Sequence, residues 1–240
     1  MLSRLGRVAL RFSEGMLSLL SLTDTPSQIM KRIALWSLIL IGIGLAVWGM
    51  AKFATSSGSQ PYLIARAISE TDWVKGNREA SVVLIEYSDL QCPACAAYAP
   101  IVNRITEEFS DRIAFVYRHF PLPQHQNAEL ASRATEAAGK QGKFWEMVDQ
   151  IFANQNTWAN ERNAQEVFRA YAQSIGLDVA QFENDRNSRE IKNKIENDYL
   201  SGIQSRINST PTFFLNGEKI QPQNYEEFRN LILQKLNPHP

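Results

Sequence analysis

The chain contains two cysteines, Cys92 and Cys95, with two residues between them in the segment SDLQCPACAAYAP, residues 88–100. Two thiols at this spacing can form a reversible disulfide, supply half of a metal site, or cross-link the chain. The thiolate is the reactive form of a cysteine. The local structure around the pair therefore decides its chemistry, according to whether it stabilises a negative charge.

The pair follows a predicted strand and precedes a predicted helix. Residues 81–87 (SVVLIEY) form a β-branched, nearly continuous apolar run, which predicts a central strand covered on both faces. Pro93 suits the first turn of a helix, and apolar residues recur at helical spacing over 94–109. Unpaired N–H groups and the dipole at a helix start stabilise an anion. We therefore expect Cys92 to be the reactive thiolate and Cys95 the more buried, resolving thiol.

The remaining elements predict an α/β domain. A second strand follows the first helix, which suggests a parallel βαβ unit, and the chain then becomes wholly helical from about 126 to 205. Asn216-Gly217 is a two-residue hairpin signal between two short strands. A cysteine pair at the first strand–helix junction is typical of a thioredoxin-like redox motif. The predicted strands are 113–118, 212–215 and 218–220, and the predicted helices are 127–139, 143–153, 163–175, 187–204 and 225–236.

One stripe in the helical region is predicted to face the core. Apolar or aromatic residues recur every four positions in the helix at 187–204, a spacing that places them on one side. The residues of this stripe are Ile191, Ile195, Tyr199 and Ile203.

Two other uses of the cysteine pair are weaker interpretations. A structural zinc site takes four ligands, but the sequence has no third cysteine, and its histidines, His119, His125 and His239, are scattered. A structural disulfide closing so short a loop would constrain the unfolded chain little. We expect no metal and no cofactor. His119 and His125 are predicted to be positioning or capping residues, with His119 at the rim of the site as the alternative.

Residues 33–50 (IALWSLILIGIGLAVWGM) form an uncharged run that predicts a transmembrane helix. At about 1.5 Å per residue it covers roughly 27 Å, nearly a hydrocarbon core. Basic residues precede it, so the N-terminal side is predicted to be cytoplasmic and the remainder exported. The alternative is a cleaved signal peptide. The predicted organisation is a cytoplasmic segment at 1–32, an anchor at 33–50, a linker at 51–71 and a catalytic domain at 72–240.

Composition narrows the function further. Hydrophobic residues make up 44% of the chain, which is ample for a core that needs no disulfide to fold. The 25 basic and 25 acidic residues balance, so no net positive charge attracts nucleic acid, and nucleic-acid binding is set aside.

Four segments together resemble the DsbA family of exported thiol-disulfide oxidoreductases, especially its membrane-anchored branch. They are VVLIEYSDLQCPACAAYAP (82–100), YRHFPL (117–122), GKFWEMVDQIF (142–152) and STPTFFLNG (209–217), and the likeness extends over about 72–236. The resemblance implies a thioredoxin fold with an inserted all-helical subdomain. It also implies that Cys92 is the nucleophile, Cys95 the resolving thiol and Pro211 a cis-proline opposite them.

Two further residues are candidates for the site. If Pro211 is a cis-proline, the preceding residue Thr210 would present its backbone to a bound cysteine-containing peptide by strand-like pairing. Glu86 lies six positions before Cys92 in a strand that should be buried. A buried carboxyl group has a raised pKa and can exchange protons with a buried thiol, so Glu86 is a candidate proton acceptor for Cys95. Strand alternation could instead turn Glu86 to solvent, or a lysine could neutralise it.

The resemblance implies a membrane-tethered oxidase that passes its Cys92–Cys95 disulfide to exported cysteine-containing proteins. A membrane redox partner of DsbB or VKOR type would reoxidise it, and the setting would be the bacterial cytoplasmic membrane, with the domain facing the periplasm or cell exterior. A reductase or isomerase running in the opposite direction and a non-catalytic thioredoxin-like binding domain stay open as alternatives. Pro93-Ala94 replaces the Pro-His of the best-known pattern, so a potential between about −120 and −270 mV is expected.

Overall fold

The computed structural model describes residues 26–56 and 67–237. The chain divides into two compact units, 1–59 and 60–240, and each is described by itself. The predicted segments at 1–32 and 51–71 fall partly outside the described residues, at 1–25 and 57–66.

The first unit contains the helix α2 (Pro26–Ser56). Its side chains from 34 to 49 are all exposed, and the large ones are apolar, among them Trp36 and Trp48. Among the residues that the structure describes, no helix combines the length and apolar character needed to cross a membrane. The anchor at 33–50 stays a prediction.

The second unit is built on a five-stranded sheet with the strand order β1-β3-β2-β4-β5. β2 and β3 are parallel, as expected for a βαβ unit, whereas β1 pairs with β3, and β4 with β2 and β5, in antiparallel fashion. Asn216 and Gly217 both have positive φ, which turns the β4–β5 hairpin as predicted. The strands are β1 (Trp73–Gly76), β2 (Val82–Ser88), β3 (Ile113–His119), β4 (Thr212–Leu215) and β5 (Glu218–Ile220).

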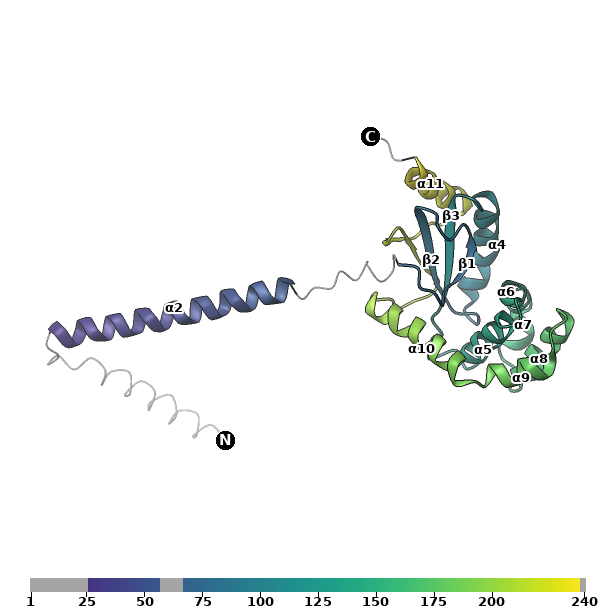
Figure 1. The fold of residues 1–240 in the computed structure, drawn as a ribbon, viewed down its shortest axis with the longest axis horizontal. Helices are drawn as coiled ribbons and strands as arrows, with labels where there is room; N and C mark the ends of the chain where they lie inside the picture. The colour runs from purple at the N-terminus through teal and green to yellow at the C-terminus, as the bar shows by residue number, and fades with distance from the viewer. Residues whose placement is uncertain (1–25, 57–66, 238–240) are drawn as a thin grey trace, which may run out of the picture. The chain divides into compact units, whose positions relative to one another are not determined.

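Two helices that contact each other pack against one face of the sheet, and a block of helices is inserted between β3 and β4 (Figure 1). The two helices on the sheet are α4 (Pro93–Glu108) and α11 (Tyr225–Leu236). The inserted helices are α5 (Ala128–Gly139), α6 (Phe144–Ala153), α7 (Gln155–Trp158), α8 (Ala164–Ser174), α9 (Val179–Arg186) and α10 (Arg189–Gln204). This arrangement confirms the predicted α/β fold with a helical insertion.

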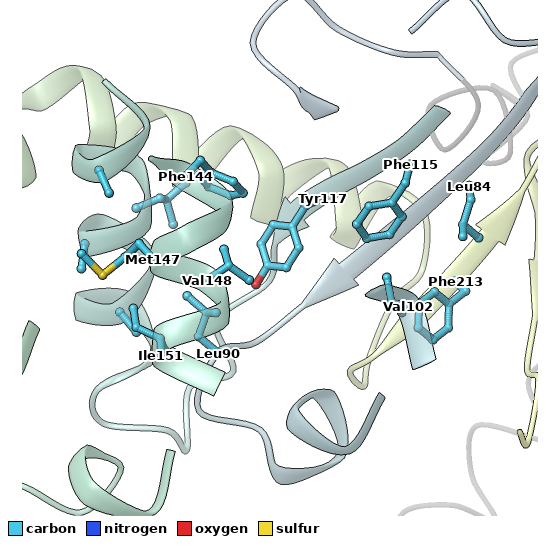
Figure 2. Close-up of a cluster of buried hydrophobic side chains, with 14 of the residues drawn as sticks. Leu84, Leu90, Val102, Phe115, Tyr117, Phe144, Met147, Val148, Ile151 and Phe213 are labelled. Carbon is cyan, nitrogen blue, oxygen red and sulfur yellow. The ribbon is translucent and has the colours of Figure 1, made fainter. Parts of the chain in front are cut away.

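Strand alternation divides the apolar residues between the two faces of the sheet. Leu84 and Phe115 face α4 and belong to the larger core, which continues into the helical block through α6 (Figure 2). Tyr87 and Phe214 face the opposite side, where Phe120 closes a smaller core. Because the first core crosses from sheet to insertion without a break, the insertion is packed as part of one domain.

Three short elements were not predicted, namely β1, α7 and α9. β1 is a four-residue strand at the edge of the sheet, and its residues are only partly buried, so it carries no clear alternation. The helix predicted at 187–204 begins after α9, and Ser188 caps its first turn by accepting a hydrogen bond from the Ile191 N–H. The predicted core stripe on this helix is wrong at Ile203, which is 48% exposed. Steps of four residues drift away from the 3.6-residue helical period, so the buried side of the helix instead passes through Asp198 and Gly202.

Candidate active site

Cys92 is the N-cap of α4, and Pro93 occupies the first helical turn. The backbone of Cys92 is extended, with φ −72° and ψ 122°, while its carbonyl accepts the first helical hydrogen bond, from Ala96 N–H at 3.2 Å. Both thiols are free, and Cys92 is 8% and Cys95 1% exposed. The structure therefore places the outer thiol at the helix start and the inner thiol in the core, as the sequence predicted.

The two thiols have opposite electrostatic surroundings. The pKa of Cys92 is lowered from 9.0 to about 5, chiefly by a hydrogen bond with the Cys95 thiol, with further help from Thr210 and from the backbone N–H groups of Ala94 and Cys95. Burial opposes this shift. The pKa of Cys95 is raised well above its ordinary value by burial first, and then by Cys92 and Glu86. At neutral pH the reduced pair is therefore a Cys92 thiolate beside a neutral Cys95.

Thr210 and Pro211 lie against the outer thiol. When Cys92 is protonated, its Sγ–H donates to the Thr210 carbonyl oxygen at 3.5 Å, a contact between residues 118 positions apart in the chain. The Thr210–Pro211 peptide bond is cis, in agreement with the prediction, and leads directly into β4, which pairs with β2. The start of β4 therefore lies beside the end of β2, where the cysteines begin.

Glu86 points into the core on the same face as Cys95. Its side chain is buried, which excludes the solvent-facing alternative. Burial raises the pKa of this carboxyl from 4.5 to about 7, and the nearby Ser88 hydroxyl partly offsets that rise. No lysine or arginine in the described part of the chain contributes to the Glu86 pKa, so the neutralised alternative gains no support there. Glu86 is thus a carboxyl group that changes protonation near neutral pH.

Tyr117 completes this buried group and was not identified from the sequence. It is the register partner of Glu86 across the parallel strands, and Figure 2 shows it between the sheet and α6. Its hydroxyl is buried without a hydrogen-bond partner, and burial together with the charges of Glu86 and Cys95 raises its pKa well above the ordinary value. The sequence signal that could have pointed to Tyr117 was its place on the strand predicted to pair with the strand of Glu86.

Asp89 holds the backbone just before the cysteines and was also missed. One carboxylate oxygen accepts the Gln91 N–H at 2.7 Å, and the other accepts the Leu122 N–H at 2.8 Å and lies 2.7 Å from His125 Nδ1. The Asp89 N–H in turn donates to Cys95 Sγ at 3.4 Å. His125 is therefore a positioning residue beside the site, as predicted.

His119 is fully buried, so its alternative placement at the rim of the site is wrong. Its Nε2 lies 3.0 Å from a Glu136 carboxylate oxygen that also accepts from the Trp73 indole N–H, and its backbone N–H donates to Asp198. His119, Glu136 and Asp198 offer ligand atoms within 4.8 Å of one another. Lys194 already binds Asp198 at 2.6 Å, so these groups form a hydrogen-bonded network joining β3 to α5 and α10.

Comparison with known proteins identifies the family. Residues 68–234 match the family model described as Thioredoxin, and the chain therefore belongs to that family. The fold is similar to alpha-DsbA1 from Wolbachia pipientis, with a TM-score of 0.65, 22% identity and coverage of 74% of this chain and 96% of that one. It is also similar to oxidised BdbD from Bacillus subtilis, with a TM-score of 0.61, 22% identity and coverage of 68% and 91%. The fold is thus a DsbA-like thioredoxin fold.

Among curated proteins, this chain is similar to Na⁺/H⁺ antiporter NhaA 1 of Mycolicibacterium gilvum. The two are 30% identical over 208 residues, which cover 83% of this chain and 33% of the antiporter. The chain thus spans about a third of the length of that relative.

Proposed function

We propose that this protein is a thiol-disulfide oxidoreductase that exchanges the Cys92–Cys95 disulfide with cysteine-containing proteins. The observation that carries the proposal is the asymmetry of the pair. One thiol has a pKa of about 5 at a helix start beside Thr210, and the other is buried with its pKa raised. Such an asymmetry provides a good nucleophile and leaving group at the surface and a resolving thiol behind it.

In the oxidising direction, a substrate thiolate attacks Cys92 Sγ of the enzyme disulfide. The Cys92–Cys95 bond breaks, and Cys95 leaves as a thiolate that takes up a proton because its pKa is high. A second substrate thiolate then attacks the substrate sulfur of the mixed disulfide, and Cys92 leaves as a stable thiolate. Two substrate thiols are thereby oxidised to a disulfide, and the enzyme disulfide is reduced to the dithiol.

Glu86 is proposed to exchange the proton with Cys95. Its pKa of about 7 allows it to donate and accept near neutral pH, and it lies close enough to Cys95 for its charge to raise the thiol pKa. Thr210 is proposed to pair through its backbone with a substrate peptide, next to Pro211. The peptide would then present its cysteine to Cys92, whose thiol contacts the Thr210 carbonyl.

The oxidase direction is favoured by the low pKa of Cys92. A stable thiolate stabilises the reduced enzyme relative to its disulfide, and this makes the disulfide a better oxidant. The reductase or isomerase direction would instead require a source of electrons that keeps the pair reduced. A titration of the Cys92–Cys95 pair against glutathione decides between the two, and a potential below about −270 mV would reject the oxidase.

The protein is proposed to be tethered to the bacterial cytoplasmic membrane by residues 33–50, with its catalytic domain in the periplasm or cell exterior. Support comes from the uncharged run in α2, whose large described side chains are exposed and apolar, and from the basic residues before it. A membrane redox partner of DsbB or VKOR type would reoxidise the pair, and exported proteins would be its substrates. In the relative named a Na⁺/H⁺ antiporter, a similar region belongs to a protein whose activity is membrane transport.

A trapping experiment tests the proposed exchange. In a Cys95→Ala variant the Cys92 thiolate can still attack a disulfide of an exported protein, which forms a mixed disulfide and releases one substrate thiolate. Because the inner thiol that would attack Cys92 and release the bound protein is missing, these covalent adducts should accumulate, and a reducing agent should release them. Cys92→Ala is the matched control and should trap none. If Cys92→Ala supports cell function as well as the unchanged protein does, the chain acts as a binding domain and not as an enzyme.

A further inference from the structure

Side-chain amides, together with Asp89, hold the backbone immediately before Cys92. Gln155, the first residue of α7, is buried and reaches into the turn between β2 and α4. Its Nε2 donates to the Leu90 carbonyl at 2.8 Å and to the Cys92 carbonyl at 3.1 Å. One side chain of the helical block thus binds both carbonyls that flank Gln91.

Gln91 and Asn127 attach the same turn to the block from the other side. The Gln91 side-chain carbonyl accepts the Asn127 N–H at 2.7 Å, and its amide donates to the Ala159 carbonyl at 2.7 Å. The Asn127 amide donates to the Trp158, Ala159 and Glu161 carbonyls. The turn before Cys92 is therefore fixed to residues at the start of α7 and just after its end.

These bonds bear directly on the reactive thiol. The Cys92 carbonyl accepts from both Ala96 N–H and Gln155, so Gln155 helps to hold Cys92 in its extended N-cap conformation. In that conformation the N–H groups of Ala94 and Cys95 interact with the Cys92 sulfur. Without Gln155, only the Ala96 N–H would hold this carbonyl, so the sulfur would be less firmly kept beside those donors.

We propose that Gln155 is a positioning residue for the Cys92 thiolate, and that the helical insertion controls the reactivity of the active site through it. This inference rests on the proposed function, because positioning matters only where Cys92 reacts. It assigns the insertion a second role beyond enclosing the core. The helical insertion thus fixes the environment of the thiol through Gln155, although it contributes no reacting atom.

The test measures the rate of iodoacetamide alkylation of Cys92 against pH in the reduced full-length protein. Gln155→Met keeps the length of the side chain and removes both hydrogen-bond donors. The pH midpoint of Cys92 alkylation should therefore rise by about half a pH unit, which corresponds to about threefold less thiolate at low pH. Gln155→Glu adds a negative charge as well and should move the midpoint further in the same direction. Gln173→Met, an exposed change on α8, is the matched control and should leave the midpoint unchanged.

The outcomes separate this inference from the proposed function. If Cys92 in the protein without substitutions titrates near the ordinary thiol pKa of about 8.5, the reactive-thiol proposal itself is overturned. If the unchanged protein titrates near 5 and Gln155→Met does the same, only the positioning role fails, even if the melting temperature falls. Should Gln155→Met not fold, Gln155→Asn keeps a polar amide but is one methylene too short to reach both carbonyls, and an unshifted midpoint there would also reject the inference.

Discussion

Glu86 and Tyr117 face each other across the parallel strands β2 and β3, and both are buried on the side of the sheet that contains Cys95. A carboxyl group and a phenol, neither with an ion-pair partner in the described part of the chain, thus lie in the core behind the reactive pair. Burial makes ionisation of either group unfavourable, and each raises the energy of a negative charge on the others. The protonation of this group is therefore coupled to that of Cys95.

The raised pKa of Glu86 predicts that the stability of the folded domain depends on pH. The pKa of Glu86 in the folded protein, about 7, lies above the ordinary value of 4.5, so between these pH values the unfolded chain releases a proton that the folded chain keeps. The free energy of unfolding should fall as pH rises through this window, by about 3 kcal/mol at most. Glu86→Gln should remove this decrease. Urea unfolding of both proteins at pH 4, 6 and 8 measures it, and parallel curves would contradict the assigned environment.

A second prediction concerns the hydrogen bond between the two thiols. The Cys95 thiol is the largest contributor to the low pKa of Cys92. Cys95→Ala removes the donor and should raise the Cys92 pKa above about 5, whereas Cys95→Ser keeps a hydroxyl donor and should raise it less. Thiolate absorbance at 240 nm against pH measures both. Equal midpoints in the two variants would show that the inner thiol does not stabilise the outer one.

Gly202 should not tolerate a side chain. A Cβ at this position of α10 would lie 2.5 Å from two ring carbons of Phe120, which is buried and stacks on Tyr199. Gly202→Ala should therefore destabilise the domain by about 1–3 kcal/mol in chemical denaturation. Glu196→Ala on the same helix is exposed and should change stability by less than about 0.5 kcal/mol. A Gly202→Ala protein as stable as its control would mean that Phe120 is not packed against α10.

Removing only one partner of the buried Arg118–Asp72 ion pair should strongly destabilise the domain. The guanidinium donates to both Asp72 oxygens at 3.1 and 2.7 Å and also to the Tyr87 hydroxyl, and all three side chains are buried. Arg118→Met leaves a buried carboxylate unpaired and should cost about 3–5 kcal/mol. Adding Asp72→Asn to it should cost less than the sum of the single changes. Thermal and urea unfolding of the three variants test this, and strict additivity would contradict a direct pair.

Local signals accounted for much of the fold and the centre of the site. The cysteine spacing, Pro93 at the helix start and the Asn216-Gly217 turn each act within a few residues, and the elements they predicted were found where expected. The cis bond at Pro211 was different, because the resemblance to a family implied it and the residues alone would favour trans.

The partners of the active-site turn could not be predicted in the same way. Gln155 lies more than 60 positions from the carbonyls it binds, and His125 lies 36 positions from Asp89. An amide at the start of a four-residue helix has no periodicity or motif to distinguish it from a solvent-exposed one. The orientation of Glu86 was also open, since a strand that is apolar on both faces does not reveal which side faces a neighbouring thiol.

The short helix α7 also has a bearing on how this enzyme class can be engineered. Attempts to retune an exchange catalyst usually begin with the two residues between its cysteines, here Pro93 and Ala94. By our inference, a second position for such changes is Gln155 at the start of α7, some sixty residues downstream, whose buried side chain binds the Cys92 carbonyl. A designer could thus adjust oxidising strength from there while leaving the four-residue motif untouched.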